Sequence, residues 1–390
     1  MYQVEPVHIS PNALTPRRTF LRSSLLLTVP LMLGGTAFSA AAATYTAPTR
    51  ARGGARVSVR DAGARGNGTA DDTNAFQRAI NSLPSTGGSI YVPTGTYLID
   101  AETSVRLRSR THLQMASGAK LVAKRTSKGR YRVLVADGVH DVEISGGQII
   151  GERDRHVGTS GEGGHGIKIE GSERITIRDI RISKCWGDGI VVGPKPVRQA
   201  PYIMSHDVVV ANVVCTGNRR NGLSIGNVTG MKVYDSEFSN THGTSPQCGI
   251  DVEPDKDFDG RGYCDNVHIE NCLIRDNAAY GFNVWKRSRN LTVTKCVIEG
   301  NKSCGLVTRG LRGARITQNT IRYNRSTGVF IQEDTVDCLI RYNTFKNNYT
   351  RQGITEMDNF SLVGVTSKVQ KHLIIGRGTS NIRVGRNYYR

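Results

Sequence analysis

The sequence predicts an all-β solenoid, a single-stranded parallel β-helix with a capping α-helix at its N-terminal end. Three observations support this fold class. The chain has 44 glycines in 390 residues, a unit of about two dozen residues repeats along its second half, and one amphipathic segment lies near its start. Many glycines beside only 12 prolines favour short strands joined by turns. With 38% hydrophobic residues, a chain of this length can bury a substantial core.

The segment 72–99 supplies the predicted cap and the first strands. Asp72 or Thr73 can begin a helix, because short polar side chains accept hydrogen bonds from the first free backbone N–H groups. Apolar residues then follow at helical spacing, at Ala75, Phe76, Ala79, Ile80 and Leu83. We therefore predict a helix over 73–83 that covers the open end of the solenoid, followed by two strands within 89–99.

The repeat is a glycine followed by a large apolar residue. It occurs at Gly166-Ile167, Gly189-Ile190, Gly222-Leu223, Gly249-Ile250, Gly281-Phe282, Gly305-Leu306, Gly328-Val329 and Gly353-Ile354. The steps are 23, 33, 27, 32, 24, 23 and 25 residues, which is the length of one β-helix turn with occasional insertions. A β-propeller is not favoured, because its blades repeat at roughly 40 residues. About 9 to 11 turns are expected from this spacing.

A second column, of asparagines, follows the same period. It comprises Asn218, Asn240, Asn277, Asn301, Asn324 and Asn347. Asparagine tolerates left-handed backbone, and its amide can bond the equivalent amide one turn away. We therefore predict a stacked asparagine ladder at one turn of the solenoid.

The N-terminus has the three parts of an export signal. Arg17 and Arg18 precede a short apolar run and a stretch of small residues, a pattern typical of a twin-arginine signal over 1–43, with a linker over 44–56 and the β-helix domain over 57–390. Cleavage would remove three basic residues and one acidic residue, which changes the formal charge from +19 to +17. We expect a periplasmic or extracellular protein without stable membrane association after signal removal, and an acidic polymer rather than nucleic acid as its partner. An uncleaved anchor is the alternative.

The eight cysteines suggest packing more than metal binding. Cys272 and Cys296 lie 24 residues apart in matching contexts and are expected to be small buried residues of the repeat. Cys248 and Cys264 flank an acidic loop, and a disulfide between them would clamp it. No C-x-x-C pair occurs in the sequence, so a structural zinc site is not expected.

Three insertions and two residue columns predict a cleft. The insertions lie after Gly193, before Gly249 and after Val252, beside one strand on successive turns. Alternate side chains of that strand point outward. Two residues past each repeat glycine stand Lys168, Val191, Ser224, Asp251, Asn283, Val307 and Phe330. Four residues past stand Glu170, Gly193, Gly226, Glu253, Trp285, Arg309 and Gln332, and Lys286 closes the Trp285 strand.

From about Val57 to the C-terminus the chain resembles the pectate-lyase-like superfamily. The resemblance lies in "GNGTADDTNAFQRAI" and "GGSIYVPTGTYLI", which occur together and in order. It implies a right-handed parallel β-helix and a secreted lyase, hydrolase, uronate epimerase or depolymerase. Against the polygalacturonase pattern, "WGDGI" puts Asp188 where the first catalytic Asp would stand. Asn221 replaces the expected His, Asp251 and Glu253 replace Arg and Lys, and no double Asp lies between.

We favour β-elimination on an acidic, uronate-containing polysaccharide. Asp251, Glu253 and Asp255 are hard oxygen ligands that could hold Ca²⁺ against a substrate carboxylate, with Lys286 or Arg309 as the base. No organic cofactor is expected. Alternatives remain open: hydrolysis with Asp188 and Asp251 or Glu253 as acid and base, C5-epimerisation, and a non-catalytic polysaccharide-binding protein.

Further candidates are two histidines and the two tryptophans. His165 precedes a repeat glycine in the column of Asp188 and Asn221, and is expected to contact substrate. His242 lies in an insertion and is a further catalytic candidate. Trp285 and Trp186 could stack on sugar rings, or they could pack under loops. A basic patch over 120–132, with Lys120, Lys124, Arg125, Lys128, Arg130 and Arg132, is expected to attract an acidic polymer.

Overall fold

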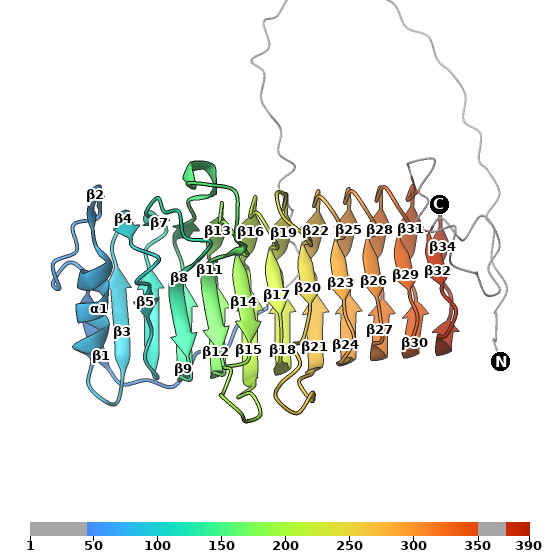
Figure 1. Ribbon diagram of the computed structural model, residues 1–390, viewed down its shortest axis with the longest axis horizontal. Coiled ribbons are helices and arrows are strands. Elements are labelled where there is room, and N and C mark those ends of the chain that lie inside the picture. The colour runs from blue at the N-terminus through green and yellow to red at the C-terminus, as the bar shows by residue number, and fades with distance from the viewer. Residues whose placement is uncertain (1–44, 350–371) are drawn as a thin grey trace, which may run out of the picture.

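The computed structural model describes residues 45–349 and 372–390, which form a parallel β-helix (Figure 1). The strands build three parallel sheets of 12, 12 and 10 strands, named sheets A, B and C in that order. Each strand pairs with the strand one turn before and one turn after it. The predicted fold class is confirmed, and the ten strands of sheet C agree with the expected number of turns.

The strands follow one another along each sheet. Sheet A contains β1 (Ala55–Ser58), β3 (Gly88–Val92), β6 (Thr111–Met115), β9 (His140–Ser145), β12 (Glu173–Arg178), β15 (Ser205–Ala211), β18 (Val228–Tyr234), β21 (Cys264–Glu270), β24 (Ser288–Thr294), β27 (Arg312–Thr317), β30 (Val336–Arg341) and β33 (Ser380–Val384). Sheet B contains β2 (Asn67–Asp71), β4 (Gly95–Ile99), β7 (Ala119–Ala123), β10 (Gln148–Ile150), β13 (Arg181–Ser183), β16 (Val214–Thr216), β19 (Glu237–Ser239), β22 (Leu273–Arg275), β25 (Val297–Glu299), β28 (Thr320–Arg322), β31 (Thr344–Lys346) and β34 (Tyr388–Tyr389). Sheet C contains β5 (Val105–Arg106), β8 (Arg130–Asp137), β11 (Gly163–Glu170), β14 (Ile190–Gly193), β17 (Leu223–Ile225), β20 (Ile250–Val252), β23 (Phe282–Val284), β26 (Leu306–Thr308), β29 (Val329–Ile331) and β32 (Leu373–Ile375).

The helix α1 (Thr73–Asn81) lies at the N-terminal end of the solenoid, as predicted, and ends two residues before the expected boundary. Phe76 and Ile80 are fully buried against the first turn, so the helix covers the open end of the core. Asp72 stands at the N-cap, but its carboxylate accepts hydrogen bonds from the backbone N–H groups of Arg65 and Gly66. A short 3₁₀ helix, η1 (Arg153–Arg155), follows β10. Within the described part of the chain, no helix is long and apolar enough to cross a membrane.

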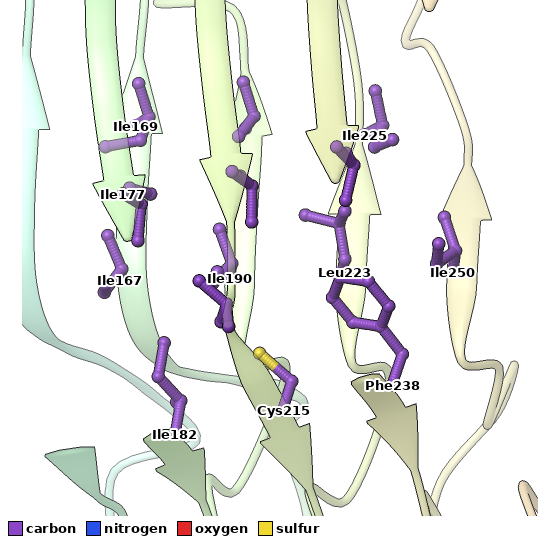
Figure 2. Close-up of a cluster of buried hydrophobic side chains, with 14 of the residues drawn as sticks. Ile167, Ile169, Ile177, Ile182, Ile190, Cys215, Leu223, Ile225, Phe238 and Ile250 are labelled. Atoms are coloured by element: carbon purple, nitrogen blue, oxygen red, sulfur yellow. The ribbon is translucent and has the colours of Figure 1, made fainter. Parts of the chain in front are cut away.

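The core is a set of aliphatic stacks inside the three sheets (Figure 2). Along sheet C, Ile167 pairs with Ile190, Leu223 follows, and Ile250 and Phe282 continue the same row. All five side chains are fully buried. Each such burial contributes about 2 kcal/mol of hydrophobic free energy, so the repeat itself stabilises the solenoid.

The asparagine ladder forms, but two of its predicted members are wrong. Asn277, Asn301 and Asn324 are buried, and each side-chain amide donates to the carbonyl of the asparagine one turn on, at 2.9 to 3.0 Å. The last rung is Asn348, not Asn347, and Thr241 takes the position predicted for Asn240. Both mispredicted asparagines have left-handed backbone, at φ values of 47° and 55°, in the turn just before the ladder.

All eight cysteines are buried free thiols. This confirms the packing role predicted for Cys272 and Cys296. Cys248 and Cys264 do not form the disulfide that would clamp the acidic loop.

Residues 45–54, most of the predicted linker, lie against sheet A. Tyr45 stacks on Tyr234 with ring centroids 3.8 Å apart. Arg50 donates to the Thr176 hydroxyl at 2.8 Å and pairs with Asp207 at 2.6 Å. These contacts make the segment a strap across several turns. The predicted export signal over 1–43 and the repeat pair Gly353-Ile354 lie outside the described residues, and Leu373 pairs with Val329 where that repeat was expected to continue sheet C.

Candidate functional site

A cavity of about 680 Å³ opens on the outer side of sheet C, around β8, β11, β14 and β17. Two of the predicted insertions contribute to its wall: Pro194 and Pro196 come from the first, and Glu253 and Asp255 come from the third. Residues 161–163, Gly129 and Arg130 also line the cavity. The insertion before Gly249 does not line the cavity, so the prediction that all three insertions wall one cleft is correct for two.

The predicted outward column has the expected register. Lys168, Val191, Ser224, Asp251, Asn283, Val307 and Phe330 pair in succession along sheet C. However, only Lys168, Val191 and Ser224 of this column line the cavity. Val307 and Phe330 are buried in a small apolar cluster with Cys304. The open part of the column therefore lies toward the N-terminal half of the solenoid.

Asp188 is the most unusual carboxylate of the cavity. It lies just before β14, only 1% exposed, and one oxygen, Oδ1, has no hydrogen-bond partner among the described residues. The other oxygen, Oδ2, lies 3.3 Å from an Arg220 nitrogen. Burial raises the pKa of Asp188 to about 6, and the Arg220 charge opposes this shift without cancelling it. Asp188 can therefore exchange a proton near neutral pH.

His165 adjoins Asp188 one turn away. Its Nδ1 accepts a hydrogen bond from the Asp188 backbone N–H at 3.2 Å and lies 3.5 Å from the Asp188 Oδ2. Burial, and then the positive charges of Lys168 and Arg220, hold the pKa of His165 well below its usual value. The ring is therefore neutral, and because Nδ1 is the acceptor, the proton resides on Nε2.

Arg220 connects the acidic groups of the cavity. Its NH1 contacts Asp188 Oδ2 at 3.3 Å, its NH2 contacts Glu253 Oε2 at 2.9 Å, and its Nε lies 3.4 Å from Glu162 Oε2. The guanidinium thus holds two cavity carboxylates on its two terminal nitrogens. Arg220 is not indicated by the sequence pattern, although it directly precedes the column residue Asn221.

Three further cations line the cavity. Lys168, on β11, pairs with Glu170 at 2.7 Å. Arg130 and Arg132, on β8, belong to the basic patch predicted over 120–132, and neither has an ion pair within the described residues. Arg132 pairs in register with His165 on the next strand. Unpaired guanidinium groups in a cavity are well suited to bind carboxylate or sulfate oxygens.

The three predicted calcium ligands differ in their surroundings. Asp251 is fully buried, accepts hydrogen bonds from Asn283 at 2.8 Å and Asn221 at 3.4 Å, and does not line the cavity. Burial, and then the nearby Glu253 charge, raise its pKa. Glu253 is bonded to Arg220, and Asp255 is exposed. Within the described chain, no group of three or more His, Cys, Asp or Glu side chains is arranged to hold a metal ion.

The remaining predicted residues lie outside the cavity. Lys286 is exposed and pairs with Asp334 at 3.0 Å. The Arg309 guanidinium lies 4.5 Å above the ring of Trp285, which is 40% exposed. His242 is exposed, and its ring contacts the carbonyl of Asn240. Hence Trp285 offers an accessible aromatic surface, and Lys286 and Arg309, the bases predicted for elimination, lie outside the cavity that Asp188 lines.

Trp186 packs as a core residue. It is 7% exposed, stacks on His156 with ring centroids 3.7 Å apart, and lies 3.8 Å from the Arg219 guanidinium. Its indole N–H donates to the carbonyl of Ser160. The structure therefore supports the packing interpretation of Trp186 and not the sugar-stacking one.

Two family models match the chain. A model described as rhamnogalacturonase A/epimerase, pectate lyase-like, matches residues 56–141. A model of the right-handed β-helix region matches residues 261–388. The first match covers the capping helix and the early strands, where the sequence resemblance to this superfamily was found.

Several known proteins resemble the chain in sequence or in fold. The chain is 30% identical over 290 residues to YclG, an uncharacterized protein of Bacillus subtilis, which covers 69% of this chain and 48% of that protein. The chain thus spans about half the length of this relative. The A-module of mannuronan C-5 epimerase AlgE6 from Azotobacter vinelandii has a TM-score of 0.60 at 19% identity, covering 85% of this chain and 96% of the module. An exopolygalacturonase from Thermotoga maritima has a TM-score of 0.52 at 15% identity, covering 77% and 89%.

The sequence matches and the structural neighbours agree on the fold. The matched models cover the two ends of the solenoid, and the neighbours superpose along most of it. The chain thus has the fold of right-handed parallel β-helix proteins, and its residues 56–141 match a pectate lyase-like family model.

Proposed function

We propose that the protein cleaves an acidic polysaccharide by glycoside hydrolysis, with Asp188 as the proton donor. The observation that carries this proposal is the buried Asp188 carboxyl, whose pKa is raised to about 6 at the wall of an open cavity. A carboxylic acid that keeps its proton up to about pH 6 can donate it to a glycosidic leaving oxygen. The fold is shared with an epimerase and a polygalacturonase, which supports a carbohydrate substrate.

Substrate recognition follows from the charges of the cavity. Arg130 and Arg132 are the cations without an ion pair in the described chain, so they bind the acid groups of the substrate. They lie on β8, next to the strand that carries His165 and one turn further from Asp188. This arrangement places an anionic sugar beside the proton donor.

The reaction divides between two carboxyl groups. Asp188 donates its proton to the glycosidic oxygen as the bond from that oxygen to the anomeric carbon breaks. Glu253 accepts a proton from the water that attacks the anomeric carbon. The Arg220 guanidinium contacts both carboxylates, which fixes their separation and stabilises Asp188 after it has lost its proton. Neutral His165 holds the Asp188 backbone through its Nδ1.

Elimination remains the second candidate, because one observation favours it. Above its pKa, Asp188 is a buried base, and Arg130 or Arg132 could neutralise a uronate carboxylate while Asp188 removes the adjacent proton. This form of elimination uses the protein's own cations. The calcium-assisted form predicted from the sequence, with Asp251, Glu253 and Asp255 as ligands, stays a prediction that a chelator tests.

Product analysis distinguishes these reactions. The protein is incubated with polygalacturonate, alginate and carrageenan, with and without a chelator, while reducing ends and the ultraviolet absorbance of unsaturated products are followed. Hydrolysis gives reducing ends without unsaturated product, in the presence of chelator. Unsaturated product would overturn the hydrolytic proposal in favour of elimination. Altered uronate stereochemistry by NMR, without cleavage, would show epimerisation. Chelator-sensitive activity would restore a metal role.

We also propose that the protein is exported through its N-terminal segment. Arg17 and Arg18 stand before an apolar run, as twin-arginine signals require. Cell fractionation of the Arg17→Lys, Arg18→Lys double variant tests this. Retention of the variant in the cytoplasm while the parent protein leaves it is the expected result, and equal export of both would contradict it.

A further inference from the structure

A second cavity, of about 360 Å³, lies where the loop 253–263 meets the starts of β24 and β27. Its described lining comprises Gly260, Arg261, Gly262, Tyr263, Arg287, Ser288, Arg289, Gly310 and Arg312. Four of these nine residues are arginines and none is acidic. The cavity shares no lining residue with the main cavity.

Three of the four arginines of this second cavity have no ion pair among the described residues, although the Arg287 charge acts on Asp255 and opposes the rise in the pKa of that carboxyl. Arg289 pairs with Asp265 at 3.1 Å and lies 4.2 Å above the ring of Tyr263. Arg261, Arg287 and Arg312 have no ion pair within the described part of the chain. Four guanidinium groups around one small cavity repel one another unless an anion joins them. Their planar donor groups match the oxygens of a carboxylate or a sulfate.

A buried hydroxyl and a tightly packed loop add to the site. Ser288 is 3% exposed, and its hydroxyl has no hydrogen-bond partner among the residues described. At Gly262, a Cβ atom would lie 1.9 Å from the carbonyl oxygen of Asp255 and 2.2 Å from the Asn227 amide nitrogen. The loop therefore packs closely on the solenoid at this point, which preforms the wall carrying Arg261 and Tyr263.

The loop 253–263 connects the two cavities. Its first residues, Glu253 and Asp255, line the main cavity, and its last residues line the second one. The second cavity is lined by Arg287, which follows β23, and by Gly310, which follows β26. These two strands lie three and four turns beyond β14, the strand next to Asp188. At a strand spacing of about 4.8 Å, the second cavity is roughly 14 to 19 Å along the solenoid axis from Asp188.

We propose that the second cavity binds an acid group, a carboxylate or sulfate, of the glycan chain that occupies the main cavity. The inference rests on the proposed function for the identity of the chain as an acidic glycan. A polymer running parallel to the axis reaches both cavities, and the second one holds a distal sugar while the first one cleaves. The site thereby favours long chains over short ones.

Binding measurements with a matched pair of double variants test the site. Arg287→Gln, Arg312→Gln removes two lining arginines, and Arg315→Gln, Arg383→Gln removes two exposed arginines outside both cavities, with the same change in net charge. Both are made together with Asp188→Asn to prevent turnover. Labelled polygalacturonate, dextran sulfate and neutral dextran are the probes, and circular dichroism checks folding.

The lining variant is expected to bind at least one polyanion about 10-fold more weakly than the matched control, because charged hydrogen bonds are lost. The polymer that loses affinity identifies carboxylate or sulfate as the acid group. Equal weakening in both double variants, or no weakening, would overturn the site, and so would failure of the parent to bind either polyanion. Specific weakening in a protein that cleaves no polysaccharide would uphold the site while refuting the proposed function.

Discussion

Two buried carboxylates, Glu143 on sheet A and Asp188 beside sheet C, have contrasting surroundings in the same solenoid. Glu143 is fully buried, and its two oxygens accept from Arg52 at 2.8 Å and from Arg178 at 2.6 and 2.8 Å. Burial favours protonation of Glu143, but the charges of His112, Arg178 and Arg52 outweigh it and lower its pKa. Asp188 has one arginine, which it shares with Glu253, and burial prevails.

The difference lies in the number of partners and in access to solvent. Glu143 is covered by the strap through Arg52, and it has every oxygen bonded, which suits a structural ion pair. Asp188 keeps one oxygen unbonded among the described residues and lines a cavity. A buried charge without full compensation costs stability, so such a group is found where chemistry requires it.

The largest expected effect is on catalysis. Asp188→Asn should lower kcat on the polysaccharide that the protein cleaves by about 1,000-fold, because the amide cannot donate the proton. The variant should still fold, and above about pH 6 it should be at least as stable as the parent, since the amide replaces a poorly compensated charge. The matched control, Asp257→Asn, changes a carboxylate of the loop 253–263 that does not line either cavity, and its rate should match the parent. Full activity in Asp188→Asn would show that the contrast with Glu143 is not functional.

The second effect is on stability. Glu143→Gln should lower the free energy of unfolding by about 3 kcal/mol, because Arg178 and Arg52 lose the carboxylate between them. Glu299→Gln, which breaks the more exposed pair with Arg322, should cost less than about 1 kcal/mol. Urea denaturation measures both, and activity of the folded Glu143→Gln protein should match the parent. Equal costs for the two variants would contradict the structural role of Glu143.

The third effect is on the pH dependence of stability, because the pKa of Asp188 is raised and that of Glu143 is lowered. The folded-state pKa of Asp188 is raised to about 6 from 3.8, so the folded protein binds more protons between these values and loses stability as pH rises. Glu143 has a lowered pKa, so its contribution is lost as pH falls below its usual 4.5. In thermal unfolding from pH 4 to 7, the Tm of Asp188→Asn should increase relative to that of the parent as pH rises.

The pH profile of activity also distinguishes Asp188 from Glu143. If Asp188 is the acid, the rate falls as pH rises above about 6. A rate that rises through this range would show Asp188 acting as a base and would favour elimination. Glu143→Gln should leave the midpoint of the profile unchanged, since Glu143 does not line the cavity.

Sequence periodicity predicts the backbone of this protein far better than its chemistry. The step between Gly166 and Gly189 predicts the pairing of Ile167 with Ile190, because a slip of one residue would expose the apolar stack. The ladder prediction fails at Asn240 and Asn347, since adjacent turn positions both favour polar residues that tolerate left-handed backbone.

Periodicity also predicts only part of the candidate site. Asp188 and His165 are predictable because they share a column beside the repeat glycine. Arg220 lies between the columns. Arg130 is predicted as part of a basic patch, but its position beside His165 is not, because its strand precedes the clear repeat. Asp251 and Glu253 are two residues apart, yet one is buried and the other exposed, because neighbouring loops cover the sheet unevenly. Side-chain contacts across turns depend on loop conformations that the period does not encode.

The smallest effect concerns the strap. Arg52→Gln removes one of two arginines from Glu143, while Arg178 still donates to Oε1 through two nitrogens, so the expected loss in the free energy of unfolding is about 1 kcal/mol. Arg56→Gln, a neighbouring exposed arginine, is the control and should be near neutral. Arg52→Gln should also raise the pKa of Glu143. Urea titrations at different pH values should then show the loss of stability in acid at a higher pH than in the parent. If Arg52→Gln cost as much as Glu143→Gln, the strap rather than sheet A would supply most of the compensation, and Glu143 would depend on a single arginine as Asp188 does.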